Sequence, residues 1–382
     1  MIMTKQFKVS LITATLAMAA LNASAAVEVY NNDGMTFSAD GLVNIFYSNS
    51  DTDSTDVNGD VTNSKQSRVK TGFLPSYIGF NFAKQLDDIK ISTRSSFWVT
   101  LSDTDAFRDT SPADAGTGTA IDARQFYATV SGDFGEVLLG KDFGLFNRAN
   151  IMGDELLTGY GQTSGGLADS GFVSFGNIAT GYTYAFPKAQ ITYRTLDMAG
   201  FKLAVGVMDP NKMSATSDEK SPRFEAELEY NTTFDDGSLK AFVSGVSQTS
   251  KSALGVDQDQ SGVGYGVNVK FSGLSLTASG FSAEGIGSLD TMVSAETNES
   301  DGYLTQASYT MGDNRFVLSY GETTTDDGIT ETTNSNSNIA YFRTIVPGVT
   351  VVAELNKTEN DNDQNTVAEE NNVFSIGAVV TF

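Results

Sequence analysis

Residues Pro222–Asn231 read PRFEAELEYN and alternate between apolar and charged side chains along their whole length. An extended strand points successive side chains to opposite faces, so this alternation gathers the apolar groups on one face. The apolar face carries Phe224, Ala226, Leu228 and Tyr230, and the other face carries Arg223, Glu225, Glu227, Glu229 and Asn231. The stretch therefore predicts a β-strand with one apolar and one charged face.

The same period of two recurs in Phe201–Met208, Gly262–Phe271 and Val349–Asn356. A soluble β-sandwich also alternates in this way. Here the polar faces carry full charges and the apolar faces often end in Phe or Tyr, which is typical of a barrel with lipid outside and water inside. No strand edge can stay unpaired in lipid, so we expect the sheet to close on itself.

Short and long connections alternate along the chain. Tight turns are predicted at Gln85–Asp88, Gly132–Gly135, Phe234–Gly237, Ser272–Gly273, Met311–Asn314 and Val346–Gly348. Long polar connections are predicted at Asn49–Ser67, Asp103–Ile121, Pro210–Ser221, Ile286–Ser300, Thr323–Ser337 and Thr358–Asn371. Counting hairpins from Met35 to Phe382 gives about sixteen strands, an even number as in bacterial barrels. The pattern predicts an all-β, transmembrane antiparallel barrel with tight periplasmic turns and longer outer loops.

Residues 1–25 have the features of a secretory signal peptide. Lys5 and Lys8 precede the apolar run Val9–Leu21, and Ala23-Ser24-Ala25 is a small-residue cleavage site. We expect the mature barrel to comprise residues 26–382, after export to the periplasm. The alternative is an amphipathic anchor that is retained.

Composition narrows the function classes further. The chain has no Cys and no His, which removes Ser-His and Asp-His hydrolase arrangements, His-ligated metals and histidine pH switches. Its net charge is −23, or −25 without the two lysines of residues 1–25, so binding to nucleic acid through phosphates is not expected. After the signal no apolar run is long enough for a membrane-spanning helix. No enzyme activity and no cofactor are predicted.

The stretch Phe143–Asn177 interrupts the alternation and is longer than an ordinary connection. Its apolar residues include Leu145, Phe146, Ile151, Met152, Leu156 and Leu157, which a solvated loop would not need. We interpret it as a loop folded into the lumen, where it would narrow a pore. The alternative is a floppy outer loop.

Several motifs in this order resemble the Gram-negative general diffusion porins. They are the mature start AVEVYNNDG, the run RQFYATVSGDFG beginning at Arg124, the triplet Leu139-Gly140-Lys141 and the terminal Phe382. The resemblance covers the whole mature chain. It implies an outer-membrane homotrimer that passes small hydrophilic solutes and ions, with a third external loop folded inward. That loop follows the fifth strand, as Phe143–Asn177 follows the predicted strand Glu136–Phe143.

The resemblance also implies a constriction between loop carboxylates and basic wall residues. On the loop, Asp154 and Glu155 match the acidic side, with Asp169 as a further candidate. The candidate wall bases are Arg94, Arg124, Lys188 and Arg194. Tyr77 stands where a wall arginine is common in the family, and Asp40 takes the place of a wall lysine. Ordinary solvated lumen residues are the alternative for each base.

The alternation does not clearly place Arg124 on the inner face, because the apolar residues Phe126 and Ala128 share its face of the strand. Arg94 shares its face with Trp98, the one Trp of the chain, and is expected to point inward.

The acidic stretch Asp51–Asp60 resembles a calcium loop, but an EF-hand frame anchored on Gly59 would begin at Ser54 and end at Lys65, and neither fits. No dedicated metal site is predicted. The outer acids could instead hold divalent cations that bridge to lipopolysaccharide phosphates, or could serve only solubility.

The acidic outer loops would surround the entrance of the channel and enrich cations there. A modest cation preference is therefore expected. The alternatives are a sugar- or oligosaccharide-specific porin, for which Tyr77 and Tyr160 would supply lumen aromatics, an outer-membrane hydrolase, and a plugged adhesive barrel without conductance.

Overall fold

The computed structural model describes residues 26–102, 121–161, 174–252, 255–287, 298–362 and 368–382. The expected signal peptide, most of the predicted connection Asp103–Ile121, and Asp169 lie outside these residues. Within the described part, nineteen strands form one sheet, and one five-residue helix, α2 (Arg148–Met152), lies between β7 and β8. No described helix is both long and apolar enough to cross a membrane.

The strands of the first half are β1 (Val27–Asn32), β2 (Met35–Thr55), β3 (Val61–Lys70), β4 (Ser76–Leu86), β5 (Ile89–Val99), β6 (Asp122–Gly132), β7 (Gly135–Phe143), β8 (Pro187–Arg194) and β9 (Phe201–Met208). Those of the second half are β10 (Asp218–Glu219), β11 (Arg223–Phe234), β12 (Gly237–Lys251), β13 (Asp257–Phe271), β14 (Leu274–Glu284), β15 (Glu299–Met311), β16 (Asn314–Asp326), β17 (Glu331–Val346), β18 (Val349–Asn362) and β19 (Ala368–Thr381).

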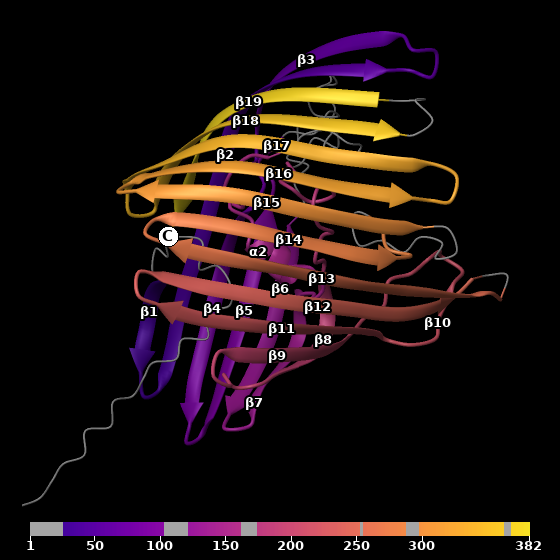
Figure 1. The fold of residues 1–382 in the computed structure, drawn as a ribbon. Helices are drawn as coiled ribbons and strands as arrows, with labels where there is room; N and C mark the ends of the chain where they lie inside the picture. The colour runs from indigo at the N-terminus through magenta and orange to yellow at the C-terminus, as the bar shows by residue number, and fades with distance from the viewer. Residues whose placement is uncertain (1–25, 103–120, 162–173, 253–254, 288–297, 363–367) are drawn as a thin grey trace, which may run out of the picture.

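The described strands pair antiparallel with their neighbours, and β19 pairs with β2 to close the barrel. Three short strands extend the line of longer ones: β1 continues β19 along β2, β3 continues β4 along β2, and β10 continues β11 along β12. The wall therefore has sixteen strand positions, which confirms the predicted fold. Figure 1 shows the strands side by side around the wall, with short turns at one end and longer segments at the other.

Burial is the reverse of that in a soluble protein. In β11, Glu227 is only 2% exposed whereas its neighbour Leu228 is 36% exposed. The same strand buries Arg223 and Glu225 and exposes Phe224. An outer apolar surface is stable against lipid, and the inner polar face is stable against water or a polar filling. This inversion is what the alternation in PRFEAELEYN predicts for a membrane barrel.

The tight turns fall where the sequence predicts them, for example at Asp87 and at Asp236, where a positive φ fits a tight turn. The predicted extent of the long polar connections is partly wrong. Much of Asn49–Ser67, Thr323–Ser337 and Thr358–Asn371 continues as paired strand. Beyond the membrane both faces of a hairpin contact water. The backbone pairing therefore continues there without the apolar–polar alternation by which a strand is recognised in the sequence.

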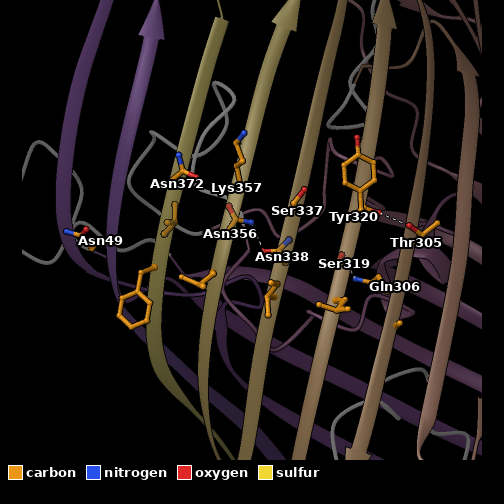
Figure 2. A pocket seen from close by; sticks show the side chains of 16 residues that line it. Asn49, Thr305, Gln306, Ser319, Tyr320, Ser337, Asn338, Asn356, Lys357 and Asn372 are labelled. Atoms are coloured by element: carbon orange, nitrogen blue, oxygen red, sulfur yellow. Dashed lines mark hydrogen bonds between the residues drawn. The ribbon is translucent and has the colours of Figure 1, made fainter.

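The outer face of β15–β19 changes from polar to apolar between two adjacent rows. Strand register places Thr305, Tyr320, Ser337, Lys357 and Asn372 side by side. The next row toward the short turns holds Ala307, Leu318, Ile339, Leu355 and Phe374. Both rows contribute to the lining of a groove of about 830 Å³. Figure 2 labels the polar row, with Thr305, Tyr320, Ser337, Lys357 and Asn372 on neighbouring strands. A polar row that contains a tyrosine, above an apolar row, fits the boundary between lipid headgroups and acyl chains.

Candidate functional site

The segment between β7 and β8, described at residues 144–161 and 174–186, is attached to polar side chains of the wall. At its start, the Glu225 carboxylate on β11 accepts hydrogen bonds from the backbone N–H groups of Leu145 (2.5 Å) and Phe146 (2.8 Å). Arg148, in α2, forms an ion pair with Glu227 on the same strand. Both glutamates are buried, so two adjacent inner positions of β11 hold the first turn of the segment.

A second attachment involves the two acids predicted for the constriction. The Asp154 carboxylate accepts hydrogen bonds from Gln306 Nε2 on β15 (2.7 Å), from the Tyr182 hydroxyl (2.5 Å) and from Asn177 Nδ2 (3.0 Å). Asp154 is only 1% exposed. It thus links the wall to both halves of the segment.

Glu155 makes its contacts on the same side of the barrel. Its carboxylate pairs with Arg315 on β16 (2.9 Å) and accepts hydrogen bonds from Ser275 on β14 (2.6 Å) and Ser308 on β15 (3.1 Å). The Arg315 guanidinium also lies 3.9 Å from the centroid of the Phe342 ring.

A third attachment lies on β18 and at the break between β3 and β4. The buried Glu354 carboxylate accepts hydrogen bonds from the backbone N–H groups of Tyr160 (2.9 Å) and Gly161 (2.6 Å). The backbone N–H of Phe73, between β3 and β4, donates to the carbonyl of Gly159 (3.0 Å). The attachments are thus spread from β11 around the wall to β18 and the β3–β4 break.

These contacts change the interpretation of the predicted acidic side. The sequence analysis set Asp154 and Glu155 against the wall bases Arg94 and Arg124. The structure instead pairs them with β14–β16, and neither acid lines the cavity beside those bases. The segment is held by Gln306, Arg315 and Glu354. Nothing in the sequence marked these residues except their place in the alternation, which predicts that they point inward.

A cavity of about 480 Å³ lies between this segment and the inner face of β2 and β4–β7. Its wall side is polar and carries Asp40, Arg94, Arg124, Gln125 and Asp142. Its segment side is largely apolar and carries Ile151, Met152, Leu157, Phe175 and Ile178. The cavity extends toward the chain ends, where Ala26 and Phe382 contribute to its lining.

A chain of hydrogen bonds joins the charged groups of the wall side. Arg94 Nη1 pairs with Asp40 Oδ2 (2.9 Å), and Arg94 Nε donates to Gln125 Oε1 (2.7 Å). Gln125 Nε2 donates in turn to Asp142 Oδ1 (2.9 Å). Asp40 therefore neutralises Arg94 across the strands, rather than only replacing a wall lysine.

Arg194 and Lys188, the candidate bases on β8, take different positions. Arg194 pairs with Glu136 (2.9 Å) and lies 3.6 Å from Asp142, both of which line the cavity. Lys188 donates to Asn211 and does not line the cavity. The two bases are thus not equivalent members of one ladder.

A β-bulge resolves the awkward parity of Arg124. Ser96 on β5 pairs with Gln125, but the next residue, Phe97, pairs with Ala123, so Arg124 is the extra residue between them. A bulge re-aims the side chain of its extra residue. Arg124 therefore lines the cavity although Phe126, on the same strand face by parity, is 61% exposed on the outside.

The aromatic residues of the wall form a stack under Arg124. The guanidinium lies 5.2 Å from the centroid of Trp98, and the Trp98 ring stacks on Tyr77 at 4.6 Å. Arg124 Nη1 donates to the Tyr184 hydroxyl (3.1 Å) and Nε pairs with Asp122 (2.9 Å). Trp98 lines the cavity, as its parity with Arg94 predicts.

Comparison with known proteins agrees with this architecture. The family model described as Gram-negative porin matches residues 13–363, so the chain belongs to the Gram-negative porin family. No curated protein sequence matches the chain.

Solved structures of low sequence identity share the fold. The anion-selective porin from Comamonas acidovorans matches with a TM-score of 0.64 at 16% identity, over 91% of this chain and 100% of that one. The outer membrane channel DcaP of Acinetobacter baumannii matches with a TM-score of 0.67 at 17% identity, over 93% and 100%. The trimer form of OmpT, an outer membrane protein of Vibrio cholerae, matches with a TM-score of 0.52 at 15% identity, over 92% and 100%.

Family and fold together make the protein a non-enzymatic, outer-membrane channel for passive diffusion.

Proposed function

We propose that the protein is a homotrimeric diffusion channel for small hydrophilic solutes and ions and that it modestly prefers cations. We further propose that residues 144–161 and 174–186 fold inward to set its narrowest part. The observation that carries this proposal is the set of attachments at Glu225, Asp154 and Glu354. They bind one segment to polar wall positions on β11, β15 and β18. Attachment at such widely separated strands supports a segment that crosses the enclosed space and leaves a cavity beside β2 and β4–β7.

The trimer is supported by the outer face near the barrel seam. Phe37 on β2 stacks on Phe80 on β4, with ring centroids 6.2 Å apart, and Phe80 lies 6.5 Å from Phe97 on β5. The small or polar residues Thr93 and Ser95 point outward on β5 beside this aromatic cluster. Hydroxyl groups are poorly suited to lipid, and small residues allow close backbone approach, so this face fits a protein contact. A structural neighbour, OmpT of Vibrio cholerae, has a trimer form.

The cation preference is supported by where charge is neutralised. Of the groups that line the cavity, Arg94 is paired with Asp40 and Glu136 is paired with Arg194, so the charge of the narrow zone is close to balance. At the outer end acids prevail and stay ionised. Backbone N–H groups of Asp60 and Asn58 lower the pKa of Asp56, and those of Thr330 and Ile329 lower the pKa of Asp327. An ionised rim enriches cations at the entrance.

The same outer acids are proposed to contact lipopolysaccharide through divalent cations. Glu359 and Glu370, on β18 and β19, share the single ammonium of Lys357 at 2.7 and 3.1 Å, so this pair of carboxylates carries an excess negative charge. Strand register places this pair two positions beyond the pair Lys357 and Asn372 of the boundary row, away from the short turns.

Sugar specificity is the second candidate, and the lumen aromatics do not favour it. A sugar slide needs exposed rings, whereas Trp98, Tyr77 and Tyr160 are 2%, 7% and 0% exposed. Planar-bilayer recording with the full mature protein tests the main proposal. Stepwise conductance, with no saturable block by maltose or other sugars, is the expected result. A protein that inserts but gives no current would contradict it.

A further inference from the structure

The cavity beside β2–β7 has two unlike sides, and this asymmetry suggests a ligand. One side is the hydrogen-bonded wall around Arg94, and the other is the apolar surface that includes Met152 and Leu157. Small-molecule sites combine a mostly apolar lining with a few convergent polar groups. At about 480 Å³, the cavity has the size of such a site.

The bases that line this cavity differ in what they can still bind. Arg94 is enclosed by Asp40, Asn81 and Gln125. Arg148 pairs with the buried Glu227. Their charges are therefore already compensated by groups of the protein itself.

Arg124 is different. A guanidinium has five N–H donors, and among the described residues Arg124 uses Nε toward Asp122 and Nη1 toward Tyr184, while Nη2 has no described partner. The side chain of Asp122 is 52% exposed, so this ion pair is solvated and competes weakly with another anion. The guanidinium carbon lies over the Trp98 ring, 5.2 Å from its centroid.

Arg124 also lies next to the apolar side of the cavity. Its partner Tyr184 packs, as does Met152, against the buried cluster that contains Trp98 and Phe143. A ligand on the free edge of the guanidinium would therefore have its remaining atoms against apolar groups of the segment.

We propose that the lumen transiently holds small organic anions at Arg124, with a carboxylate on the guanidinium and a compact apolar body against Met152 and its neighbours. This proposal rests on the channel function above and names a solute class for it. The planar guanidinium matches a carboxylate geometrically, and charge-assisted hydrogen bonds of this kind are among the strong ones. Burial of the apolar body adds to the binding.

The probes are three small solutes, tested by single-channel recording with the mature protein at ~0.1 M KCl, where charges within about 10 Å still interact. Benzoate carries both features, benzyl alcohol has the apolar body without the charge, and acetate has the charge without the body. We expect transient, saturable block by benzoate, with benzyl alcohol and acetate weaker by about tenfold each, the effect of losing one such contact. Equal block by acetate and benzoate, or no block by any probe in a conducting channel, would overturn the proposal.

Arg124→Gln should weaken the benzoate block about tenfold, and Arg124→Lys should weaken it less, because the charge remains without the planar fork. The matched control is Lys90→Gln, which removes one positive charge from the same cavity near its turn end. Equal losses in Arg124→Gln and Lys90→Gln would show a diffuse electrostatic effect and overturn the site. Unblocked conductance close to the wild-type value shows that each variant is folded.

A second readout uses Trp98, the only tryptophan of the chain. Because Trp98 lies directly under Arg124, benzoate should change its fluorescence saturably in wild type and in Lys90→Gln. No change in either protein would contradict binding at this position. Absence of any conductance would instead contradict the channel proposal, so the two failures are distinguishable.

Discussion

Asp154 shows how one buried carboxylate can organise a long segment. It is 1% exposed, and its hydrogen-bond donors come from Gln306 on β15 and from Asn177 and Tyr182 in the later part of the segment between β7 and β8. A solvated acid facing the permeation path would need none of these partners. We therefore propose that this side chain acts on the shape of the lumen rather than on its charge.

Replacement of Asp154 by Ala tests this role. The donors of Gln306 and Tyr182 lose their acceptor, and a buried donor left unsatisfied costs about 1–3 kcal/mol. We expect a loosened segment, seen as higher open-channel current noise and conductance, with the reversal potential almost unchanged. The control is Asp53→Ala, which removes an exposed acid on β2 and should leave the noise unchanged. A quiet, anion-selective Asp154→Ala channel would place the carboxylate in the permeation path instead.

At the scale of elements, the segment and the wall are held by different kinds of bond. The wall strands form a continuous backbone ladder, whereas most attachments of residues 153–161 involve a wall side chain, and the bond from the Phe73 N–H to the Gly159 carbonyl is a backbone exception. The segment nevertheless buries Leu156 and Tyr160 completely. Its removal should leave the ladder closed but should also remove packing from the centre of the barrel.

Deletion of Gly153–Gly161 is therefore expected to enlarge the channel and lower the thermal stability together. Liposome-swelling rates for larger sugars should rise, and the melting temperature of the oligomer should fall, because Glu354 and Arg315 lose their partners. A matched deletion of Asp56–Asp60, in the turn between β2 and β3, should change neither. Unchanged swelling after the first deletion would mean that residues 153–161 do not narrow the channel.

Where β19 pairs with β2 to close the barrel, the last residue, Phe382, is bonded to and packed on Gly41. The backbone N–H of Gly41 donates to the carbonyl of Phe382 (2.8 Å), and the N–H of Phe382 donates to the carbonyl of Gly41 (3.1 Å). The Phe382 ring covers Gly41 so closely that an added Cβ would lie 2.4 Å from it. The terminal ring and the glycine thus form one unit at the junction of β19 and β2.

Deletion of Phe382 and the substitution Gly41→Val should each lower the yield of heat-resistant oligomer in the outer membrane, because each removes or displaces this unit. Val380→Ala, an outward change on the same strand, is the control and should assemble nearly normally. Assembly is checked by the mobility of unheated samples in gels. Normal oligomer from the Phe382 deletion would show that the seam closes without its terminal ring.

At the scale of the whole molecule, the charge of −23 is distributed unevenly. The described cavity is nearly balanced by its ion pairs, while the outer hairpins carry the excess of acids. The long-range field therefore arises mainly at the entrance, where mobile ions screen it.

A cation preference of this origin should depend on salt. Under a KCl gradient the reversal potential should indicate K⁺ preference at ~0.1 M and approach neutrality near ~1 M, where the Debye length falls from about 10 Å to about 3 Å. Because the folded structure lowers the pKa of Asp56 and Asp327, these acids stay charged as pH falls, and the preference should persist down to the ordinary carboxyl range near pH ~4. Anion selectivity at low salt would show that Arg124 and the other wall bases dominate.

Local patterns in the sequence sufficed for the barrel, the tight turns and the place of the long segment after Phe143. A period of two is a property of consecutive residues, and lipid and water then determine which face points outward. The same parity placed Arg94 and Trp98 on the inner face. The ends of the strands were underestimated, because a hairpin wet on both faces has no alternation to detect.

The functional site depended on partners far apart in the chain, which only the tertiary structure brings together. Tyr160 and its acceptor Glu354 are 194 residues apart, and Glu155 and Arg315 are 160 residues apart. The pattern of neighbouring residues in the sequence does not tell which inward-pointing wall residue will contact a given residue of the segment. The direction of Arg124 likewise depends on one unpaired residue between β5 and β6, since strand register is set by the neighbouring strand and not by the residue itself.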